Sequence, residues 1–265
     1  MRRVLTDEQR QAVAARYLTG CSSEDMAREY GVDAGTVLNV LRAAAIPRRP
    51  PSVANRRLAL DESVFDVITP ESAYWVGFLM ADGSVGDRSA YRESASINLT
   101  LSEKDWGHVE KFKLFLGAGH AVQRMHYPPS RPAYRITVQS SRLAVALARY
   151  GVVPRKSLTA EVRGGLDSNR DFWRGVVDGD GYIDAHMVQL CGARRLCEQF
   201  AAFARRIVPT RAAVLPHKNI WRVSVGGSFT LPLVCALYSD CTVALDRKLA
   251  VARSIISQGE ARRAA

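Results

Sequence analysis

The chain contains the same pattern twice, and this internal repeat restricts its fold more than any other feature. Residues 75–83 read WVGFLMADG, and residues 173–181 read WRGVVDGDG. The patterns that follow the two copies run in the same order, and each series ends at a basic pair, Arg155-Lys156 in the first and Arg247-Lys248 in the second. The repeat predicts two similarly folded units that pack against each other.

Each copy predicts the same succession of helices (α) and strands (β), αββαββα. After each motif helix come a strand, an amphipathic helix, a strand pair and a closing helix. The strands and the closing helix are expected at 95–101, 121–127, 134–139 and 141–150 in the first copy, and at 187–191, 212–215, 221–225 and 230–238 in the second. We predict an α+β fold with two pseudo-symmetric units, 69–165 and 166–258, and a basic tail at 259–265.

The motif helices carry signals for their start and for their packing. Thr69 is a good N-cap and Pro70 suits the first turn, so the first helix is expected to begin there. Small residues recur four positions apart, namely Gly77 and Ala81 in the first helix and Gly175 and Gly179 in the second. Glycine inside a helix costs up to about 1 kcal/mol relative to alanine, so such a stripe indicates close approach of another backbone. We expect the two helices to pack along these stripes.

Both motif helices end in Asp-Gly, Asp82-Gly83 and Asp180-Gly181. A glycine just past the last turn is a usual C-cap signal. An aspartate beside it is disfavoured, because the C-terminal end of a helix already carries partial negative charge. If the helices pack along their small faces, two carboxylates meet at one end. Hard oxygen ligands of this kind, completed by water and phosphate oxygens, suit Mg²⁺.

These two runs resemble the paired motifs of single-chain LAGLIDADG homing endonucleases, and the resemblance covers about residues 69–256. It implies that the motif helices pack side by side and that the two sheets form a saddle over the DNA major groove. It also implies that Asp82 and Asp180 bind the catalytic divalent ions, with the backbone at Gly83 and Gly181 beside them. Mg²⁺ is the expected cofactor, Mn²⁺ is expected to substitute for it, and no organic cofactor is expected.

The same resemblance assigns further residues and an activity. It places a basic residue of each unit near the metals, for which Lys156 and Lys248 fit, and a polar residue near the end of the second strand, for which Ser102 and Gln189 fit. The implied reaction is metal-assisted hydrolysis of both strands of a long DNA target, leaving short 3′ overhangs. The single-chain type implies that a monomer acts.

The chain departs from the family pattern at two positions. Met80 replaces the first acidic residue of the motif in the first unit, whereas Asp178 retains it in the second. Since that position is not the metal ligand, the change is expected to affect packing only. Arg174 replaces a small residue, so its side chain is expected to leave the interface between the helices.

Residues 1–47 predict a small domain of three helices at 7–18, 24–30 and 34–45. Ala27, Gly31, Val32 and Val37 match a helix-turn-helix pattern that resembles the resolvase and invertase type. The expected DNA-reading face of the third helix carries Thr36, Asn39 and Arg42, with Asn39 suited to a base edge and Arg42 to a phosphate. A three-helix bundle that does not bind DNA is the alternative.

Residues 48–68 predict a linker rich in proline and arginine. The prolines favour an extended chain, and Arg48, Arg49, Arg56 and Arg57 make it positive. Such an arm is expected to lie in the minor groove of DNA, and the alternative is a solvated linker.

The charge of the whole chain favours a polyanionic partner. Thirty-seven Lys and Arg residues against 26 Asp and Glu give a formal net charge of +11. Nucleic acid is the usual partner of such a surplus, and a solubilising surface is the alternative. The five cysteines form no C-x-x-C pair, so reduced core cysteines are expected. No secretory signal and no apolar run of about 20 residues is present, which predicts a cytoplasmic protein, or one inside a host cell if phage-encoded.

Three functions remain open at this point. The first is an active double-strand DNA endonuclease. The second is a DNA-binding transcription regulator that keeps the fold and has lost cleavage, and the third is an intron maturase that binds intron RNA. Degenerate relatives lose the metal ligands, whereas both aspartates and both lysines are present here. The sequence therefore favours the endonuclease.

Overall fold

A computed structural model describes residues 5–48, 58–86, 95–126, 128–129 and 131–264. The chain divides into two compact parts, Met1–Arg57 and Leu58–Ala265, called here the N-terminal domain and the body. Each part is described by itself. Among the described residues, every helix is too short or too polar to span a membrane.

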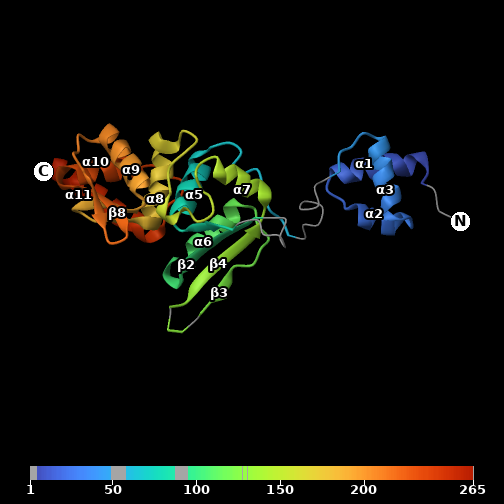
Figure 1. Ribbon diagram of the computed structural model, residues 1–265, viewed down its shortest axis with the longest axis horizontal. Helices are drawn as coiled ribbons and strands as arrows, with labels where there is room; N and C mark the ends of the chain where they lie inside the picture. Colours follow the sequence, from blue (N-terminus) through green and yellow to red (C-terminus); the bar gives the residue numbers. More distant parts are fainter. Residues whose placement is uncertain (1–4, 49–57, 87–94, 127, 130, 265) are drawn as a thin grey trace. The chain divides into compact units, whose positions relative to one another are not determined.

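Three helices build the N-terminal domain: α1 (Asp7–Leu18), α2 (Ser23–Tyr30) and α3 (Ala34–Ala43) (Figure 1). Side-chain oxygens of Thr6, Ser22 and Asp33 cap the three helices in turn. Gly31 ends α2 in the left-handed region, at φ +63°. Val13, Met26, Val37 and Leu41 are fully buried and make a small core. The three predicted helices are therefore present, although α3 ends two residues early because Ala45 takes a left-handed conformation.

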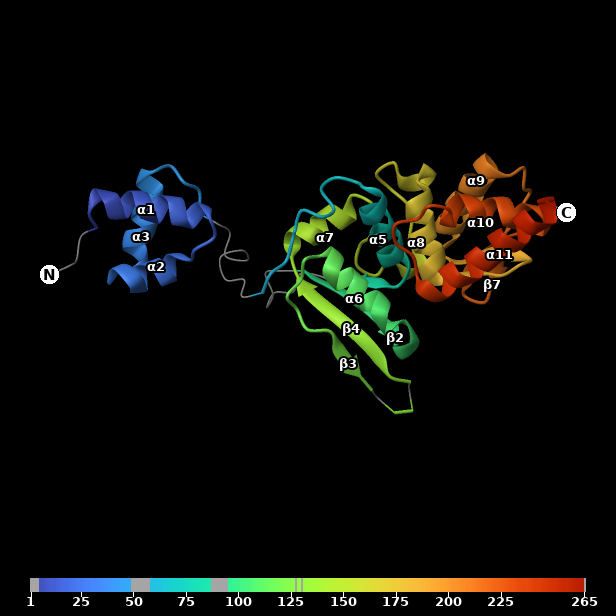
Figure 2. The ribbon, with the colours of Figure 1, turned by 180° about the vertical axis from the view of Figure 1, so that it is seen from behind.

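The body contains the αββαββα succession twice, followed by one more helix (Figure 2). The short strands Gly83–Val85 and Gly181–Ile183 were not among the segments placed from the sequence. The first unit has α5 (Pro70–Ala81), β1 (Gly83–Val85), β2 (Ser96–Ser102), α6 (Trp106–Phe115), β3 (Gln123–Met125), β4 (Ala133–Gln139) and α7 (Ser141–Ala148). The second has α8 (Arg170–Asp180), β5 (Gly181–Ile183), β6 (Met187–Gly192), α9 (Arg194–Ile207), β7 (Val214–His217), β8 (Ile220–Gly226), α10 (Thr230–Tyr238) and α11 (Asp246–Ala264). The predicted fold class is confirmed.

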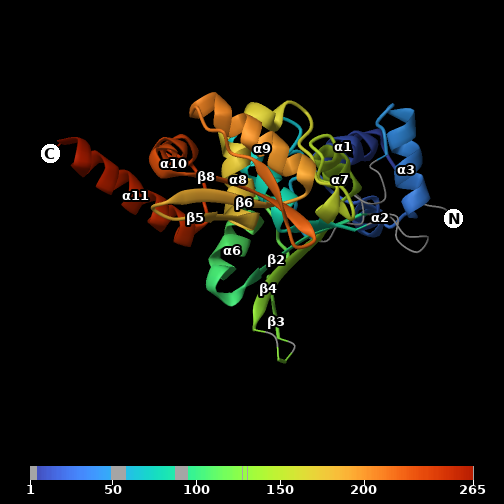
Figure 3. The same cartoon turned by 60° about the vertical axis from the view of Figure 1, so that its left-hand side comes forward.

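Each unit has one antiparallel four-stranded sheet, in the order β1-β2-β4-β3 and β5-β6-β8-β7. Along β2 the side chains of Ile97, Leu99 and Leu101 are buried while their neighbours are partly open. Helix α6 packs on the buried face of the first sheet, and α9 packs on the equivalent face of the second (Figure 3). Because side chains alternate along a strand, every second residue lies on the other, partly open face, which none of the helices in the described residues covers.

Helices α5 and α8 lie side by side at the centre of the body (Figure 1). A methyl group added at Gly77 would lie 2.0 Å from the carbonyl oxygen of Phe172, and one at Gly175 would lie 2.1 Å from that of Tyr74. One at Gly179 would lie 2.3 Å from the Cβ of Ala81. The small-residue stripes therefore sit where the two backbones approach most closely. The glycines are required there because a side chain would push the helices apart.

Two boundaries differ from those predicted. Residues 58–68, assigned to the linker, pack on the first unit, because Phe65 is fully buried in its core and Ser140 donates a hydrogen bond to Glu62. Residues 259–264, assigned to a basic tail, continue α11, and Gly259 is buried against Leu231. Both segments carry apolar or small residues that fill gaps in the body. Arg48 is exposed, and Arg49, Arg56 and Arg57 lie outside the described residues.

The glycines after the motif helices have a different reason from the one predicted. Gly181 caps α8 in an extended conformation, at φ −95°, and Gly83 begins β1 directly after α5. A Cβ at Gly83 would lie 2.7 Å from Cα of Leu79, and one at Gly181 would lie 2.6 Å from the carbonyl oxygen of Val177. Close packing of each strand on the last helical turn, and not a left-handed C-cap, therefore demands glycine.

Candidate active site

Asp82 and Asp180 meet at one end of the α5–α8 pair. Asp82 is the C-cap residue of α5, and Asp180 is the last residue of α8. The Oδ2 atom of Asp82 lies 3.4 Å from the Cβ position of Gly179, so this carboxylate reaches across to the other helix. Both aspartates remain accessible to solvent. Packing of the two small-residue stripes thus brings together two carboxylates that are 98 positions apart (180 − 82).

The two carboxylates disturb each other's ionisation. Partial withdrawal from water, together with the nearby charge of Asp82, raises the pKa of Asp180 to about 6. The pKa of Asp82 is also raised by withdrawal from water, while Lys248 and Lys156 oppose this shift. A bound cation would relieve this repulsion, because it favours both ionised forms.

The donor set at this point fits a hard divalent cation. Two carboxylates offer oxygen ligands, and both are open to water and to an incoming phosphate. Within the described ranges, no three His, Cys, Asp or Glu side chains cluster as a complete metal site. In Mg²⁺ sites that use one or two carboxylates, water and substrate phosphate oxygens complete the coordination shell.

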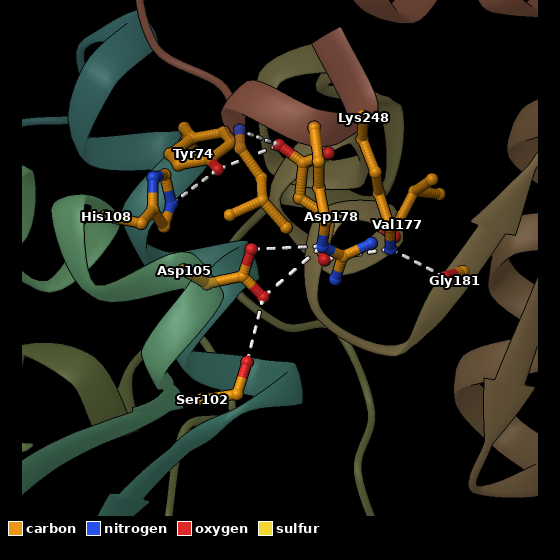
Figure 4. A network of polar contacts seen from close by, with 10 residues as sticks. Tyr74, Ser102, Asp105, His108, Val177, Asp178, Gly181 and Lys248 are labelled. Atoms are coloured by element: carbon orange, nitrogen blue, oxygen red, sulfur yellow. Dashed lines mark hydrogen bonds and ion pairs between the residues drawn. The ribbon is translucent and has the colours of Figure 1, made fainter. Parts of the chain in front are cut away.

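Each motif helix receives a buried lysine at this same end. Lys156 donates a hydrogen bond to the carbonyl oxygen of Gly83, at 2.5 Å. Lys248 donates to three carbonyl oxygens, those of Val177 (2.6 Å), Asp178 (2.9 Å) and Gly181 (2.6 Å) (Figure 4). The Lys248 ammonium therefore lies where the carbonyls of the last turn of α8 gather negative charge, and Lys156 contacts the first residue of β1, directly after α5.

Burial lowers the pKa of both lysines, that of Lys248 to about 8. The charges of Asp180 and Asp82 oppose the shift at Lys156, and the charge of Asp178 opposes it at Lys248. At neutral pH Lys248 keeps its proton, so a positive charge stands beside each carboxylate of the pair. The structure brings all four residues expected from the repeat, Asp82, Asp180, Lys156 and Lys248, to one place.

Asp178 does more than fill space in the second unit. Its fully buried carboxylate accepts hydrogen bonds from Tyr238 Oη (2.7 Å), the Leu245 amide (2.7 Å) and Tyr74 Oη (2.8 Å). Figure 4 shows Tyr74 beside Asp178. Tyr74 belongs to the first unit, so the network joins the two units. Since the only hydroxyl proton of Tyr74 goes to Asp178, His108 Nε2 donates to the tyrosine oxygen at 2.8 Å. The expectation about packing concerned Met80 in the first unit, which is a buried apolar residue, whereas Asp178 in the second unit forms a buried hydrogen-bond network.

Arg174 stays in the interface, contrary to expectation. Its fully buried guanidinium donates to the carbonyl oxygens of Val243 (2.8 Å) and Leu237 (3.0 Å) and pairs with Asp171 (2.7 Å). It also lies 5.2 Å from the centroid of the Tyr74 ring of α5. A charge in this position is tolerated because carbonyls, a carboxylate and an aromatic face surround it.

Ser102 and Gln189, which were paired from the sequence, do not occupy equivalent positions. Gly181 faces Leu190 in the second sheet, whereas Gly83 faces Leu99 in the first. This register makes Asn98 the counterpart of Gln189. An alignment on the buried leucines of the two strands would have shown the correspondence.

Ser102 instead belongs to a contact between the units. It donates to Asp105 at 3.4 Å, and Asp105 accepts a hydrogen bond from Arg247 Nε at 3.0 Å (Figure 4). Asp105 was not found from the sequence, because it lies 142 positions from its partner and follows no motif.

The predicted DNA-contacting residues of the N-terminal domain lie on or near its surface. Asn39 and Arg42 are exposed on α3, and Arg42 donates to the Asn39 side chain at 3.3 Å. Thr36 is partly exposed, and its hydroxyl donates to Asp33 at 3.1 Å. Thr36 therefore helps to cap α3, which leaves Asn39 and Arg42 as the freer polar pair on this helix.

Comparison with known proteins supports the fold through structure alone. No family model and no curated protein sequence matches the chain. Solved structures do match. I-DmoI in complex with DNA and calcium has a TM-score of 0.52 at 13% identity, over 73% of this chain and 99% of that one.

Two further solved structures give the same result. The homing endonuclease I-WcaI bound to its DNA recognition sequence has a TM-score of 0.50 at 8% identity, over 71% of this chain and 91% of that one. The LAGLIDADG homing endonuclease I-SmaMI bound to cleaved DNA has a TM-score of 0.50 at 14% identity, over 72% and 88%. The chain thus has the fold of LAGLIDADG homing endonucleases.

Proposed function

We propose that this protein is a site-specific, metal-dependent double-strand DNA endonuclease. The observation that carries the proposal is the meeting of Asp82 and Asp180 at the ends of two packed helices, each with a buried lysine bonded to the carbonyl oxygen of the residue that follows the aspartate. Carboxylate pairs open to a phosphate serve metal-assisted phosphodiester hydrolysis. The solved structures of similar fold are homing endonucleases bound to DNA, which agrees with this assignment.

The aspartates, lysines and glycines of the site would have different roles in the reaction. Asp82 and Asp180 would hold Mg²⁺ or Mn²⁺, and a bound divalent ion supplies an acidified water and neutralises the phosphate. Lys156 and Lys248 keep positive charge beside the carboxylates, where negative charge develops as the phosphodiester breaks. Gly83 and Gly181 allow each strand to begin directly against the last turn of the helix that ends in the aspartate.

Duplex DNA is the proposed partner, and one chain supplies both units, so a monomer would act. The net charge of +11 gives the long-range attraction to phosphates. In the N-terminal domain, Asn39 and Arg42 would reach the major groove, and the arginines of residues 48–57 would follow the backbone or the minor groove. Deletion of residues 1–47 should therefore weaken binding and shorten the footprint at one end only.

Selection of cleaved sites from a randomised duplex library with Mg²⁺ tests the proposal. We expect one preferred long site, cut on both strands, and no product with chelator or with an Asp82→Asn, Asp180→Asn double variant. Selection should be repeated by binding alone, without Mg²⁺. A protein that selects a site and never cuts it would contradict the nuclease assignment.

One observation favours a second candidate, a DNA-binding regulator without cleavage. Lys248 is tied to three backbone carbonyls, so its ammonium already serves the helix end. Selected but uncut sites in the experiment above are the result that this candidate expects.

A further inference from the structure

The uncovered faces of the two sheets can be compared position by position. The register places Leu99 and Leu190 at equivalent buried sites, facing Gly83 and Gly181. The residue before each leucine and the residue after it therefore lie on the uncovered face. Asn98 thus corresponds to Gln189, and Thr100 corresponds to Cys191.

Two features of this face are alike in both units. In the first, Thr137 donates to Asn98 Oδ1 at 2.7 Å, and in the second, Ser224 donates to Gln189 Oε1 at 3.2 Å. An arginine stands on the next rung of each ladder, Arg135 opposite Thr100 and Arg222 opposite Cys191. Both faces therefore keep an amide–hydroxyl pair and one positive charge.

The outer positions of the same rungs differ in chemistry. Beside the amide the first sheet has Ser84, and the second has Tyr182. Beside the arginine the first sheet has Gln123, and the second has Leu215. Tyr182 and Leu215 are 53% and 51% exposed, whereas no large exposed apolar side chain in the described part of the chain belongs to a strand of the first sheet.

Exposed apolar side chains on one of two otherwise similar faces indicate an apolar contact there. In the DNA major groove the apolar group is the C5 methyl of thymine, whereas the other base edges offer hydrogen-bond donors and acceptors. Arg222 and Gln189 remain between Leu215 and Tyr182, and the chain is strongly basic, so a polyanion suits this face better than a protein partner.

We propose that the two units read different chemistry in their DNA half-sites. The first unit recognises hydrogen-bonding base edges through Ser84, Asn98 and Gln123, and the second recognises thymine methyl groups through Leu215 and Tyr182. This inference rests on the proposed function only as far as sequence-specific DNA binding. It requires no cleavage.

Deoxyuridine substitution tests the inference with the full-length chain in the absence of Mg²⁺. Deoxyuridine lacks the C5 methyl of thymidine and keeps its hydrogen-bonding groups. On the selected duplex, replacing the thymines of one half-site should weaken binding about four-fold for each contacted methyl, and the same replacement in the other half-site should have no effect.

Matched exchanges assign the half-sites to the units. Leu215→Gln places in the second sheet the glutamine that the first sheet has at the equivalent position. Gln123→Leu makes the opposite change in the first sheet. Both positions are exposed. Leu215→Gln should reduce the deoxyuridine effect in the sensitive half-site by the share of the methyl that Leu215 contacts, and should leave the share of Tyr182. Gln123→Leu should leave that effect unchanged and alter base preference in the other half.

Equal deoxyuridine effects in both halves, or none in either, would overturn the inference while leaving DNA recognition intact. A change in sedimentation of Leu215→Gln without a change in base preference would show that this face contacts protein instead. Failure to select any duplex would refute the proposed function as well.

Discussion

Each end of the two motif helices has one aspartate, one glycine and one lysine, and the two ends hold these residues differently. In the first unit, Lys156 contacts one carbonyl, and Met80, two positions before Asp82, is a buried apolar residue. In the second, Lys248 contacts three carbonyls, and Asp178 ties α8 to Tyr238, to Leu245 and to the other unit. The comparison shows that pseudo-symmetry of fold does not require equal rigidity at the two half-sites.

Substitution of either aspartate is expected to have the same effect on cleavage, whichever unit it belongs to. Asp82→Asn and Asp180→Asn are each expected to abolish double-strand cleavage, because each carboxylate would hold metal, and to leave affinity for DNA largely intact. Single-turnover cleavage and gel-shift titration measure the two effects. Nicking of one strand by a single variant is compatible with this assignment. Full activity in either variant is not.

Variants of the two lysines should distinguish a role in catalysis from a role in DNA binding. Lys156→Met and Lys248→Met are expected to lower the single-turnover rate on saturating DNA by roughly 10²–10³-fold, as loss of a transition-state donor does. Thermal unfolding of both variants checks the fold, and Lys248→Met should lose more stability because three carbonyls lose their donor. If both variants cleave saturating DNA at the wild-type rate, the two lysines serve DNA binding and not catalysis.

Asp178 and Met80 occupy equivalent positions in the two motif helices, so substitutions at these positions test the difference between the two units. Asp178→Met is expected to lower the free energy of unfolding by about 3 kcal/mol, since two tyrosine hydroxyls and one amide lose a buried acceptor. Asp178→Asn keeps an acceptor and should cost less. Met80→Leu, a volume-conserving change, is the control and should cost less than about 1.5 kcal/mol. Denaturant unfolding measures all three, and equal losses for Asp178→Met and Met80→Leu would contradict the network.

The smallest expected effect concerns pH. In the folded protein the pKa of Asp180 is raised to about 6, above its unfolded value near 3.8. The protonated Asp180 carboxyl therefore contributes fully to the free energy of unfolding below pH 3.8, and this contribution is lost as pH rises through 6. Metal-free protein should therefore become less stable from about pH 4 to pH 6, relative to Asp180→Asn. Melting curves at fixed ionic strength test this. Parallel curves for wild type and variant would show that Asp180 ionises normally.

The sequence predicted the parts of the site that depend on short spacings. Thr69 caps α5 through contacts within three residues, and Gly77 and Gly175 mark close approach by their four-residue spacing. Asp82 and Asp180 follow from the repeat. Ser102 and Gln189 were mispaired, because equivalence on a sheet is set by ladder register, which buried Leu99 and Leu190 decide across strands.

By itself, therefore, the sequence determined the two-unit fold, the helix starts and the meeting of two carboxylates, since these depend on patterns repeated along the chain. Only the tertiary structure decided that residues 58–68 belong to the body, that Arg247 pairs with Asp105, and that Asp178 accepts from Tyr74. The partners in the last two contacts lie 142 and 104 positions apart. Only tertiary packing brings such groups together. Because a buried polar atom without a hydrogen bond lowers the stability of the fold, each of these groups is paired.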